Sequence, residues 1–194
     1  VGSETGLNVE NLVGSGMIAG ETSAAYDSTF TLTYVTARSV GIGAYLVRLG
    51  QRVIQKESAA PIILTGHAAL NKVLGREVYV TNEQLGGVKV MYPNGITHLV
   101  VKDDVEGVGA ILDWLSYVPR KIGERLPIIE SMDPINRKID VVPGSSLYDP
   151  RCMLGGCDSD ADDGKFLYGF FDRGSWKETL GGWARTVVTG RARL

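Results

Sequence analysis

The sequence predicts an α/β protein made of repeated β-β-α units, and three observations support this class. Short runs rich in β-branched and aromatic residues alternate with segments whose apolar residues recur every three or four positions. Glycine or acidic turns separate the strand-like runs from the helix-like segments. Strand-like runs come in pairs before several helices, which favours stacked β-β-α units over a plain βαβ sheet.

The first unit begins with a strand-like run at residues 30–36, which is rich in threonine and aromatic residues. Gly41 and Gly43 mark a turn after it. The next apolar residues fall at i, i+3, i+4 and i+7 and predict one helical face, made of Ile42, Tyr45, Leu46 and Leu49. Gly50 is expected to end this helix.

The second unit has strand-like runs at 52–55 and 61–64. A helix over residues 67–74 follows Gly66, and we expect Gly75 to end it.

The third unit is predicted to have strands at 78–80 and 97–101. The segment from Asp103 to Glu106 has the pattern of a capping box, which marks the start of a helix. The apolar face of that helix is predicted from residues at i, i+3, i+4 and i+7, namely Val108, Ile111, Leu112 and Leu115. Pro119 is expected to stop it.

Residues 119–165 differ from the rest of the chain, because they hold five of the seven prolines and an acidic run. This composition predicts a long, irregular connection. The pattern of regular elements is expected to resume with a strand at 166–171, a helix near 175–184 and a strand at 186–194.

Composition excludes several classes of protein. The formal net charge of −2 gives no general nucleic-acid footprint, and no apolar run approaches the roughly 20 residues that span a bilayer. No signal peptide is visible, so we expect a protein that is not secreted. Because the chain begins at Val1 rather than Met, we expect it to be a segment of a longer protein.

The side chains that could bind metal or act as bases give weak signals. Cys152 and Cys157 are too few for a disulfide framework and lack zinc spacing, so they are expected to be free thiols in a reducing compartment. The acidic run at 158–164 fails the calcium-loop pattern and is interpreted as a solvated loop without metal. His67 and His98 stand apart from any catalytic motif, and surface or capping roles are expected for both.

Two glycine-rich stretches, at 14–20 and at 41–43, look like parts of dinucleotide-binding loops. The second stretch lies between a predicted strand and a predicted helix, and Glu57 could act as the acidic partner of a nucleotide ribose. The backbone N–H groups of such a turn can equally hold a phosphate or an oxyanion, or the turn can be purely structural. Arg38, just before this turn, could pair with a carboxylate or phosphate, although a solvated surface role is the simpler interpretation.

Long ungapped stretches of the chain resemble the carboxyltransferase domain of eukaryotic multidomain acetyl-CoA carboxylases. These stretches cover residues 35–52, 61–66, 69–79, 84–87, 114–119, 148–151, 182–184 and 190–194. The resemblance implies a partial crotonase-like superhelix of β-β-α units. Residues 1–194 would form part of the N-terminal half of that domain, with the irregular connection at about 119–165.

The resemblance also implies an activity, which is carboxyl transfer from carboxybiotin to acetyl-CoA to form malonyl-CoA for fatty-acid synthesis. Biotin would be carried on another domain, and this segment would bind no metal. The partners would be acyl-CoA, the carboxybiotin carrier domain and the C-terminal half of the carboxyltransferase domain from a second subunit. The isolated segment is expected to be inactive, and the location to be the cytoplasm or a plastid.

Five residues take roles by position in the resemblance. The backbone N–H groups of Gly41 and Ile42 would face the oxyanion, and Arg38 would bind the acyl-CoA. Tyr45 would line the pocket, and Leu12 matches the aliphatic position that tunes the binding of herbicides.

Three other functions remain open at this point. The chain could belong to a carboxyltransferase for another acyl-CoA such as propionyl-CoA, or it could be a folded but catalytically inert segment. A dinucleotide-binding oxidoreductase built on Gly41 and Glu57 is the third.

Overall fold

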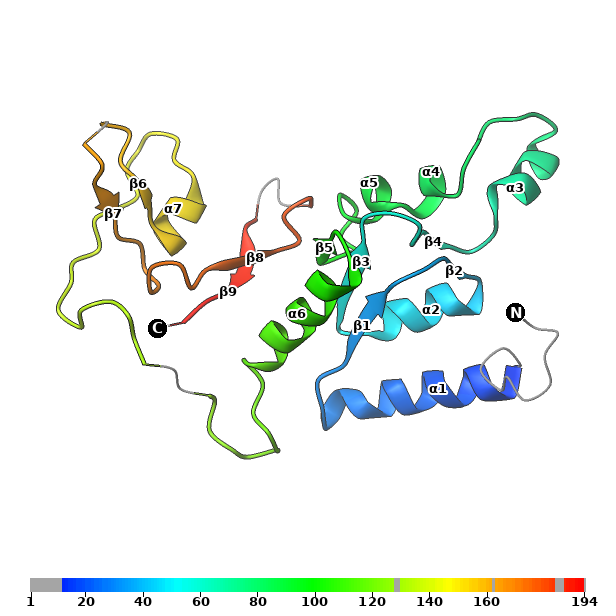
Figure 1. The fold of residues 1–194 in the computed structure, drawn as a ribbon, viewed down its shortest axis with the longest axis horizontal. Helices are drawn as coiled ribbons and strands as arrows, with labels where there is room; N and C mark the ends of the chain where they lie inside the picture. The colour runs from blue at the N-terminus through cyan, green and yellow to red at the C-terminus, as the bar shows by residue number, and fades with distance from the viewer. Residues whose placement is uncertain (1–11, 128–129, 162, 184–186, 194) are drawn as a thin grey trace. The chain divides into compact units, whose positions relative to one another are not determined.

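The structure is a computed structural model that describes residues 12–127, 130–161, 163–183 and 187–193 (Figure 1). The chain divides into two compact units, Val1–Pro127 and Ile128–Leu194, which we call unit 1 and unit 2 and describe separately. Each described helix is too short or too polar to cross a bilayer.

A three-stranded parallel sheet lies at the centre of unit 1 (Figure 1). Its strands are β1 (Leu32–Val35), β3 (Arg52–Lys56) and β5 (Leu99–Val101), with β3 in the middle. Leu32 pairs with Arg52, and Ile54 pairs with Leu99, so the register runs without interruption across the sheet. The predicted strands at 30–36, 52–55 and 97–101 are confirmed with slightly different ends.

A second, two-stranded parallel sheet joins β2 (Ser39–Val40) to β4 (Ile62–Ile63). The helix α2 (Ile42–Leu49) follows β1 and β2, and α3 (His67–Leu74) follows β3 and β4. The predicted order of two strands and one helix is therefore confirmed twice. β5 is followed by α6 (Asp104–Leu115), which packs against the three strands of the first sheet.

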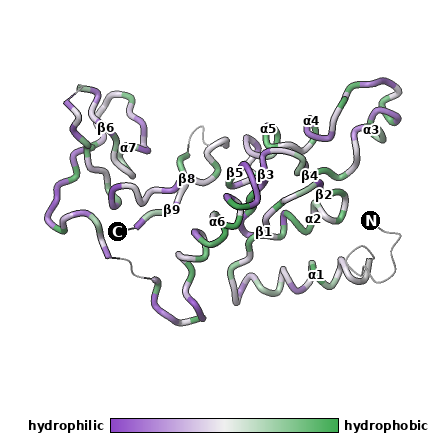
Figure 2. The backbone as a smooth tube through the Cα atoms, in the orientation of Figure 1, coloured by the Kyte–Doolittle hydropathy of each residue, from purple (hydrophilic) through white to green (hydrophobic). Residues whose placement is uncertain are grey.

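Side-chain alternation along β3 divides the core of unit 1 into two hydrophobic clusters. Val53 packs with Val47 and Ile62 in the cluster below α2. Ile54, its neighbour in the strand, points to the other side and packs with Trp114 of α6. Figure 2 shows hydrophobic residues over α2 and α6, the helices that supply these two clusters. Consecutive apolar residues, such as Val53 and Ile54, are typical of a parallel strand that is buried on both faces.

The helix ends follow local chemistry. At the start of α6, the Asp103 carboxylate accepts a hydrogen bond from Glu106 N at 2.9 Å, and Glu106 Oε2 accepts one from Lys102 N at 2.7 Å. α3 ends at Gly75, which adopts a left-handed conformation with φ of 66°. Both expectations from the sequence are confirmed.

Gly50 ends α2 for a different reason from the one that the pattern suggested. Its φ is −63°, so no left-handed conformation requires glycine. A Cβ at this position would overlap the Thr33 hydroxyl, and the residue is buried. Close packing of the helix end against β1 therefore excludes a side chain.

Two predictions for unit 1 are wrong. Residues 14–20 form no loop, because they lie within α1 (Leu12–Ala24), which packs against α2. Residues 78–80 form no strand, because Asn71 Oδ1 accepts the N–H groups of Val78 and Tyr79 at 3.0 and 3.1 Å. A side-chain amide takes the place of a strand partner there. Two short helices, α4 (Glu83–Gly86) and α5 (Val88–Met91), complete the unit.

Unit 2 has less regular structure, and its elements differ from the sequence prediction. The helix α7 (Pro150–Gly155) and the strand β6 (Cys157–Asp158) lie inside the segment that was predicted to be irregular. β6 pairs antiparallel with β7 (Phe166–Leu167), which is shorter than the predicted strand at 166–171.

The last elements of unit 2 form an antiparallel pair of strands. The predicted helix near 175–184 is wrong, because β8 (Lys177–Thr179) begins there and pairs with β9 (Thr189–Arg191). β9 lies within the predicted strand at 186–194, whose residues 186 and 194 lie outside the described residues.

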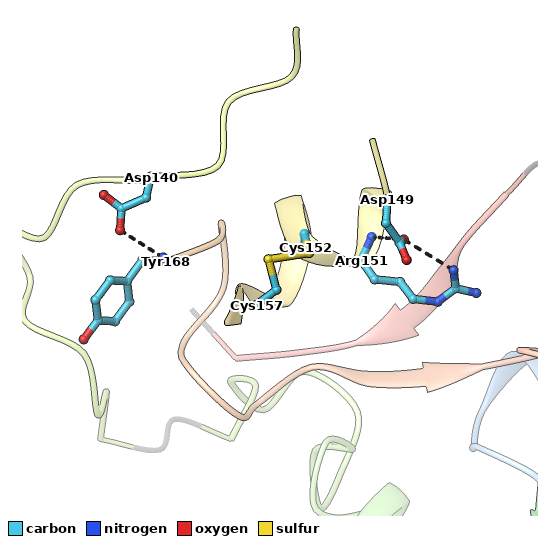
Figure 3. Close-up of a disulfide and its surroundings, with 6 residues drawn as sticks. All are labelled: Asp140, Asp149, Arg151, Cys152, Cys157 and Tyr168. Atoms are coloured by element: carbon cyan, nitrogen blue, oxygen red, sulfur yellow. Dashed lines mark hydrogen bonds and ion pairs between the residues drawn. A yellow bond between two sulfur atoms is a disulfide. The ribbon is translucent and has the colours of Figure 1, made fainter. Parts of the chain in front are cut away.

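The prediction of free thiols is also wrong, because Cys152 and Cys157 form a disulfide (Figure 3). The two cysteines lie at the start of α7 and in β6, and Gly156 between them adopts a φ of 77°. This glycine turns the chain back so that the two Cα atoms lie 5.0 Å apart, which is within the range of disulfides.

Candidate functional site

The turn between β2 and α2 is the best-defined candidate site in unit 1. Gly41 lies in this turn with φ of 58° and ψ of −118°, a conformation that residues with a Cβ rarely adopt. The space around it is not the constraint, because a Cβ would meet only Leu64 O at 3.8 Å. Glycine is therefore required here by the backbone conformation.

The two backbone N–H groups of the turn, those of Gly41 and Ile42, differ in their hydrogen bonding. Gly41 N donates to Ile63 O of β4 at 2.9 Å, so this N–H is used within the protein. Gly41 O accepts from Ala44 N at 3.0 Å and starts α2. Ile42 carries the first amide of the helix, which has no acceptor inside the helix. Of the two N–H groups expected from the sequence to be donors, that of Gly41 is engaged within the protein, and the role of the Ile42 amide toward a ligand stays a prediction.

The side chains expected at the site lie on the exposed surface of unit 1. Ile42 and Tyr45 are 46% and 63% exposed and lie three residues apart, so they share one face of α2. Arg38 is exposed in the connection between β1 and β2. Arg38 thus precedes the turn in the chain, and the two α2 residues follow it, with all three side chains exposed.

Leu12 is the first residue of α1, but its side chain lies outside the described part of the structure. Its expected role stays a prediction.

Two cavities open in the described part of unit 1. One of about 370 Å³ lies beside Glu57 and Lys89. The other, of about 480 Å³, is lined by Ala44 of α2 and by aliphatic side chains that include Ile63, and both of these residues are hydrogen-bonded to Gly41. The second cavity therefore borders the turn, whereas Arg38, Ile42 and Tyr45 line neither cavity and lie on the open surface.

His98 takes no part in this surface, and the expected surface or capping role is wrong for it. Only 8% of His98 is exposed, and its Nδ1 accepts a hydrogen bond from Val53 N at 3.1 Å. Burial, together with the positive charges of Arg52 and Arg48, lowers the pKa of His98 to about 4. The neutral His98 ring packs edge-on against Trp114 in the core of unit 1.

His67 is the first residue of α3, and the side chain that caps the helix there is that of Asn82 rather than the histidine. Its backbone N–H donates to Asn82 Oδ1 at 2.9 Å, and its Nδ1 lies 3.0 Å from the same oxygen. No nucleophile or carboxylate takes part in this contact.

A tyrosine and a carboxylate form a polar contact on the other side of the sheet. Tyr34 donates to Asp104 Oδ1 at 2.8 Å, and Lys56 Nζ lies 3.4 Å from the same oxygen. Burial and the Asp104 carboxylate raise the pKa of Tyr34 to about 12, so the hydroxyl keeps its proton. A Cβ at Gly107 would overlap the Tyr34 ring, which shows how closely α6 approaches β1.

The acidic loop of unit 2 is organised by local hydrogen bonds. Lys165 N donates to Asp163 Oδ1 at 3.0 Å, and this bond holds the pKa of Asp163 below its usual range. Within the described residues, no group of three or more His, Cys, Asp or Glu side chains is placed to hold a metal ion.

The glycine-loop hypothesis for a dinucleotide fails at 14–20, because a helix leaves no turn to hold a pyrophosphate. Glu57 lies just after β3, and its side chain is exposed. No sequence pattern points to Ile63, whose carbonyl oxygen accepts the Gly41 N–H, because any residue type supplies that acceptor.

Comparisons with known proteins show which family the chain resembles over its whole length. The model of the carboxyl transferase domain matches residues 1–194. The chain is 58% identical to acetyl-CoA carboxylase 2 of Arabidopsis thaliana and 54% identical to acetyl-CoA carboxylase of Dictyostelium discoideum, in each case over 100% of this chain. It spans about 8% of the length of these relatives.

A solved structure of transcarboxylase 12S, with methylmalonyl-coenzyme A and methylmalonic acid bound, has a similar fold. The TM-score is 0.79 over 94% of this chain and 34% of the transcarboxylase chain, at 22% sequence identity. This likeness confirms the expected partial crotonase-like architecture of β-β-α units. The match of the domain model over all 194 residues decides the family: the chain belongs to the carboxyl transferase domain family.

Proposed function

We propose that this chain forms part of the carboxyltransferase site of an acetyl-CoA carboxylase, where acetyl-CoA is converted to malonyl-CoA. The observation that carries the proposal is the Gly41 turn, which leaves the Ile42 amide at the open start of a helix. Identity of 54–58% to acetyl-CoA carboxylases over the whole chain supports acetyl-CoA as the substrate.

The Ile42 N–H is the proposed donor to the thioester oxygen of the acyl-CoA. Removal of a proton from the acetyl group gives an enolate, and negative charge then develops on that oxygen. A fixed N–H donor at this point stabilises the transition state more than the bound substrate. The N-terminal end of α2 adds a partial positive charge in the same place.

Arg38 and Tyr45 are the proposed binding side chains. The Arg38 guanidinium is exposed beside the turn and can pair with a carboxylate, which suits the malonyl product. Tyr45 presents an exposed ring one helical turn from Ile42 and would cover one side of the acyl group. Leu12 is proposed to line the same pocket and to tune the binding of herbicides.

Carboxybiotin, carried by another domain, would supply the carboxyl group. Its fit to this chain rests on the exposed apolar surface of Ile42 and Tyr45, which is open to a planar ring system. The C-terminal half of a carboxyltransferase domain from a second subunit is the proposed partner that closes the site. The proposed location is the cytoplasm or a plastid.

The experiment that tests this function compares two arginines in the full-length protein that carries this segment. Arg38→Ala is expected to lower kcat/KM for acetyl-CoA carboxylation by about 30- to 1,000-fold, which corresponds to roughly 2–4 kcal/mol for a lost charged contact in a closed site. Arg48→Ala, on the exposed last turn of α2, is expected to change it less than about fivefold. Equal effects would contradict the assignment. Propionyl-CoA measured beside acetyl-CoA decides the acyl-CoA preference.

A further inference from the structure

Gln55 places a fully buried amide in the central strand of unit 1, with 0% of the residue exposed. Its Nε2 donates to two carbonyl oxygens, those of Ala60 at 2.9 Å and Gly86 at 3.0 Å. Its Oε1 accepts a hydrogen bond from the hydroxyl of Thr97, which is also fully buried, at 2.5 Å. Both donor hydrogens and the oxygen thus have partners inside the protein.

A buried amide is unusual at position 55, because the neighbouring core positions of β3 hold valine and isoleucine. Burial of an amide is unfavourable unless all its hydrogen bonds are made, so an apolar side chain would serve packing alone. A satisfied polar network instead fixes one arrangement of the segments that it joins. The Gln55 amide therefore sets a geometry that an apolar side chain would not set.

The segments that Gln55 joins are those that flank and cover β4. Ala60 comes just before β4, and Gly86 ends α4 so close to β4 that a Cβ there would overlap Ile62 O. The amide fixes both at once. β4 is consequently held from its N-terminal end and from the side of α4.

β4 in turn carries the hydrogen bonds that position the Gly41 turn. Ser39 N donates to Pro61 O at 3.0 Å, and Gly41 N donates to Ile63 O at 2.9 Å. These two bonds lie on the same side of the backbone that leads into α2, one before and one after Val40. A shift of β4 would move the turn with it.

We propose that Gln55 is a positioning residue, which acts through β4 to hold the Gly41–Ile42 turn in the geometry used for carboxyl transfer. The inference rests on the proposed role of the Ile42 amide. It assigns to Gln55 no contact with substrate. A displaced donor stabilises the developing charge less well, so the effect of losing Gln55 falls on kcat rather than on KM for acyl-CoA.

The test uses the full-length protein and measures two quantities for Gln55→Met, which keeps the size of the side chain and removes its hydrogen bonds. The first is hydrogen–deuterium exchange of the peptide 39–45, which contains the Ser39 and Gly41 amides bonded to β4. The second is kcat and KM for acetyl-CoA. We expect faster exchange, a kcat lowered at least about tenfold and a KM within about threefold.

The matched control is Ile54→Ala, which removes volume from the same strand on its opposite face, away from the turn. At an equal loss of melting temperature it should leave exchange in 39–45 and kcat close to wild type. Thr97→Val gives a milder second disruption of the network, whereas Thr97→Ser, which keeps the hydroxyl, should behave like wild type.

The proposal is overturned if Gln55→Met leaves exchange in 39–45 unchanged, if Ile54→Ala raises it equally, or if exchange rises while kcat does not fall. Hydrogen–deuterium exchange can be measured whether or not the protein is catalytically active. A wild-type protein that fails to carboxylate acetyl-CoA would therefore contradict the proposed function, while the exchange comparison would still decide whether Gln55 holds the turn.

Discussion

Unit 1 and unit 2 are held together by different kinds of interaction. Among the described residues, every buried hydrophobic side chain belongs to unit 1, and all but Ile63 lie in the two clusters on either side of β3. Unit 2 combines aromatic pairs, such as the stacked rings of Phe171 and Trp176, with charged and covalent contacts. Asp133 and Arg137 form an ion pair at 2.7 Å, Arg151 binds Glu178 through two nitrogens at 2.7 and 2.8 Å, and a disulfide closes the α7–β6 turn.

The difference shows which unit can hold a reactive group in a fixed position. A close-packed core has one arrangement and resists displacement, and Gly41 N is bonded to β4 of this core. Ion pairs and a disulfide respond to charge, salt and redox state. We therefore expect changes in unit 2 to alter stability, and changes at the turn in unit 1 to alter catalysis.

The largest loss of stability is expected when the ion pair between Asp133 and Arg137 of unit 2 is broken. Arg137 is mostly buried, and its guanidinium also donates to the carbonyl oxygens of Gly169 and Phe171 at 2.9 and 3.1 Å. Arg137→Met removes these bonds and leaves Asp133 buried without its ion-pair partner, which should cost about 3–5 kcal/mol.

Urea unfolding followed by limited proteolysis of the full-length protein would locate that loss. Cleavage should rise in residues 130–183 and not in unit 1. The neighbouring exposed Lys138→Met is the control and should change stability by under about 0.5 kcal/mol. Unchanged cleavage in Arg137→Met would show that unit 2 is held by something other than this ion pair.

A smaller effect is expected in unit 1, where the free energy of unfolding should depend on pH through His98. Native His98 stays neutral down to its lowered pKa of about 4, whereas the unfolded chain takes up a proton near the ordinary value of 6.5. The unfolded state therefore binds more protons between these values, and stability falls as the pH falls from about 6.5 to 4. The contribution is complete above pH 6.5 and lost below pH 4, and it amounts to at most about 3 kcal/mol.

Urea unfolding at pH 7.0 and 4.5 would measure this loss, with His98→Gln as the comparison. The variant should be less stable at pH 7.0, and its stability should depend less on pH over this range. An equal dependence in both proteins would mean that other groups cause it.

The smallest of these effects concerns the disulfide. Cys152 and Cys157 close a short loop, for which chain entropy gives about 2 kcal/mol of stabilisation. Treatment with a dithiol reductant should lower the stability of unit 2 by about that amount and leave unit 1 unchanged. The double variant Cys152→Ser/Cys157→Ser should not respond to the reductant. If the reductant also destabilised the double variant, the loss of stability would not come from the Cys152–Cys157 disulfide.

The sequence predicted the parts of unit 1 whose local signals agree with their packing. The helices α2, α3 and α6 each combine an apolar spacing with a glycine or acidic boundary, and all three are confirmed. α1 was missed because its glycines resemble a loop, although the helix packs against α2. This tertiary contact outweighs the low helix propensity of glycine.

Unit 2 was harder to predict, because its elements depend on contacts between distant residues. The segment 177–179 has no strong strand signal, but it pairs with β9 and carries Glu178, which binds Arg151. The disulfide depends on the turn at Gly156, which cysteine spacing alone does not show. At the candidate site, resemblance placed Arg38, but no pattern could show that Ile63 engages the Gly41 N–H.

The measurement that tests the central claim most directly is kcat of Gly41→Ala in the full-length protein. Alanine disfavours the φ of 58° and ψ of −118° that the turn requires, so the Ile42 donor should be displaced. We predict a kcat lowered by roughly 100- to 1,000-fold with the fold intact by circular dichroism. Gly50→Ala, whose Cβ would overlap Thr33, should instead lower the melting temperature and keep its kcat. If Gly41→Ala only melts earlier and keeps its kcat, the turn is structural and its role in carboxyl transfer is wrong.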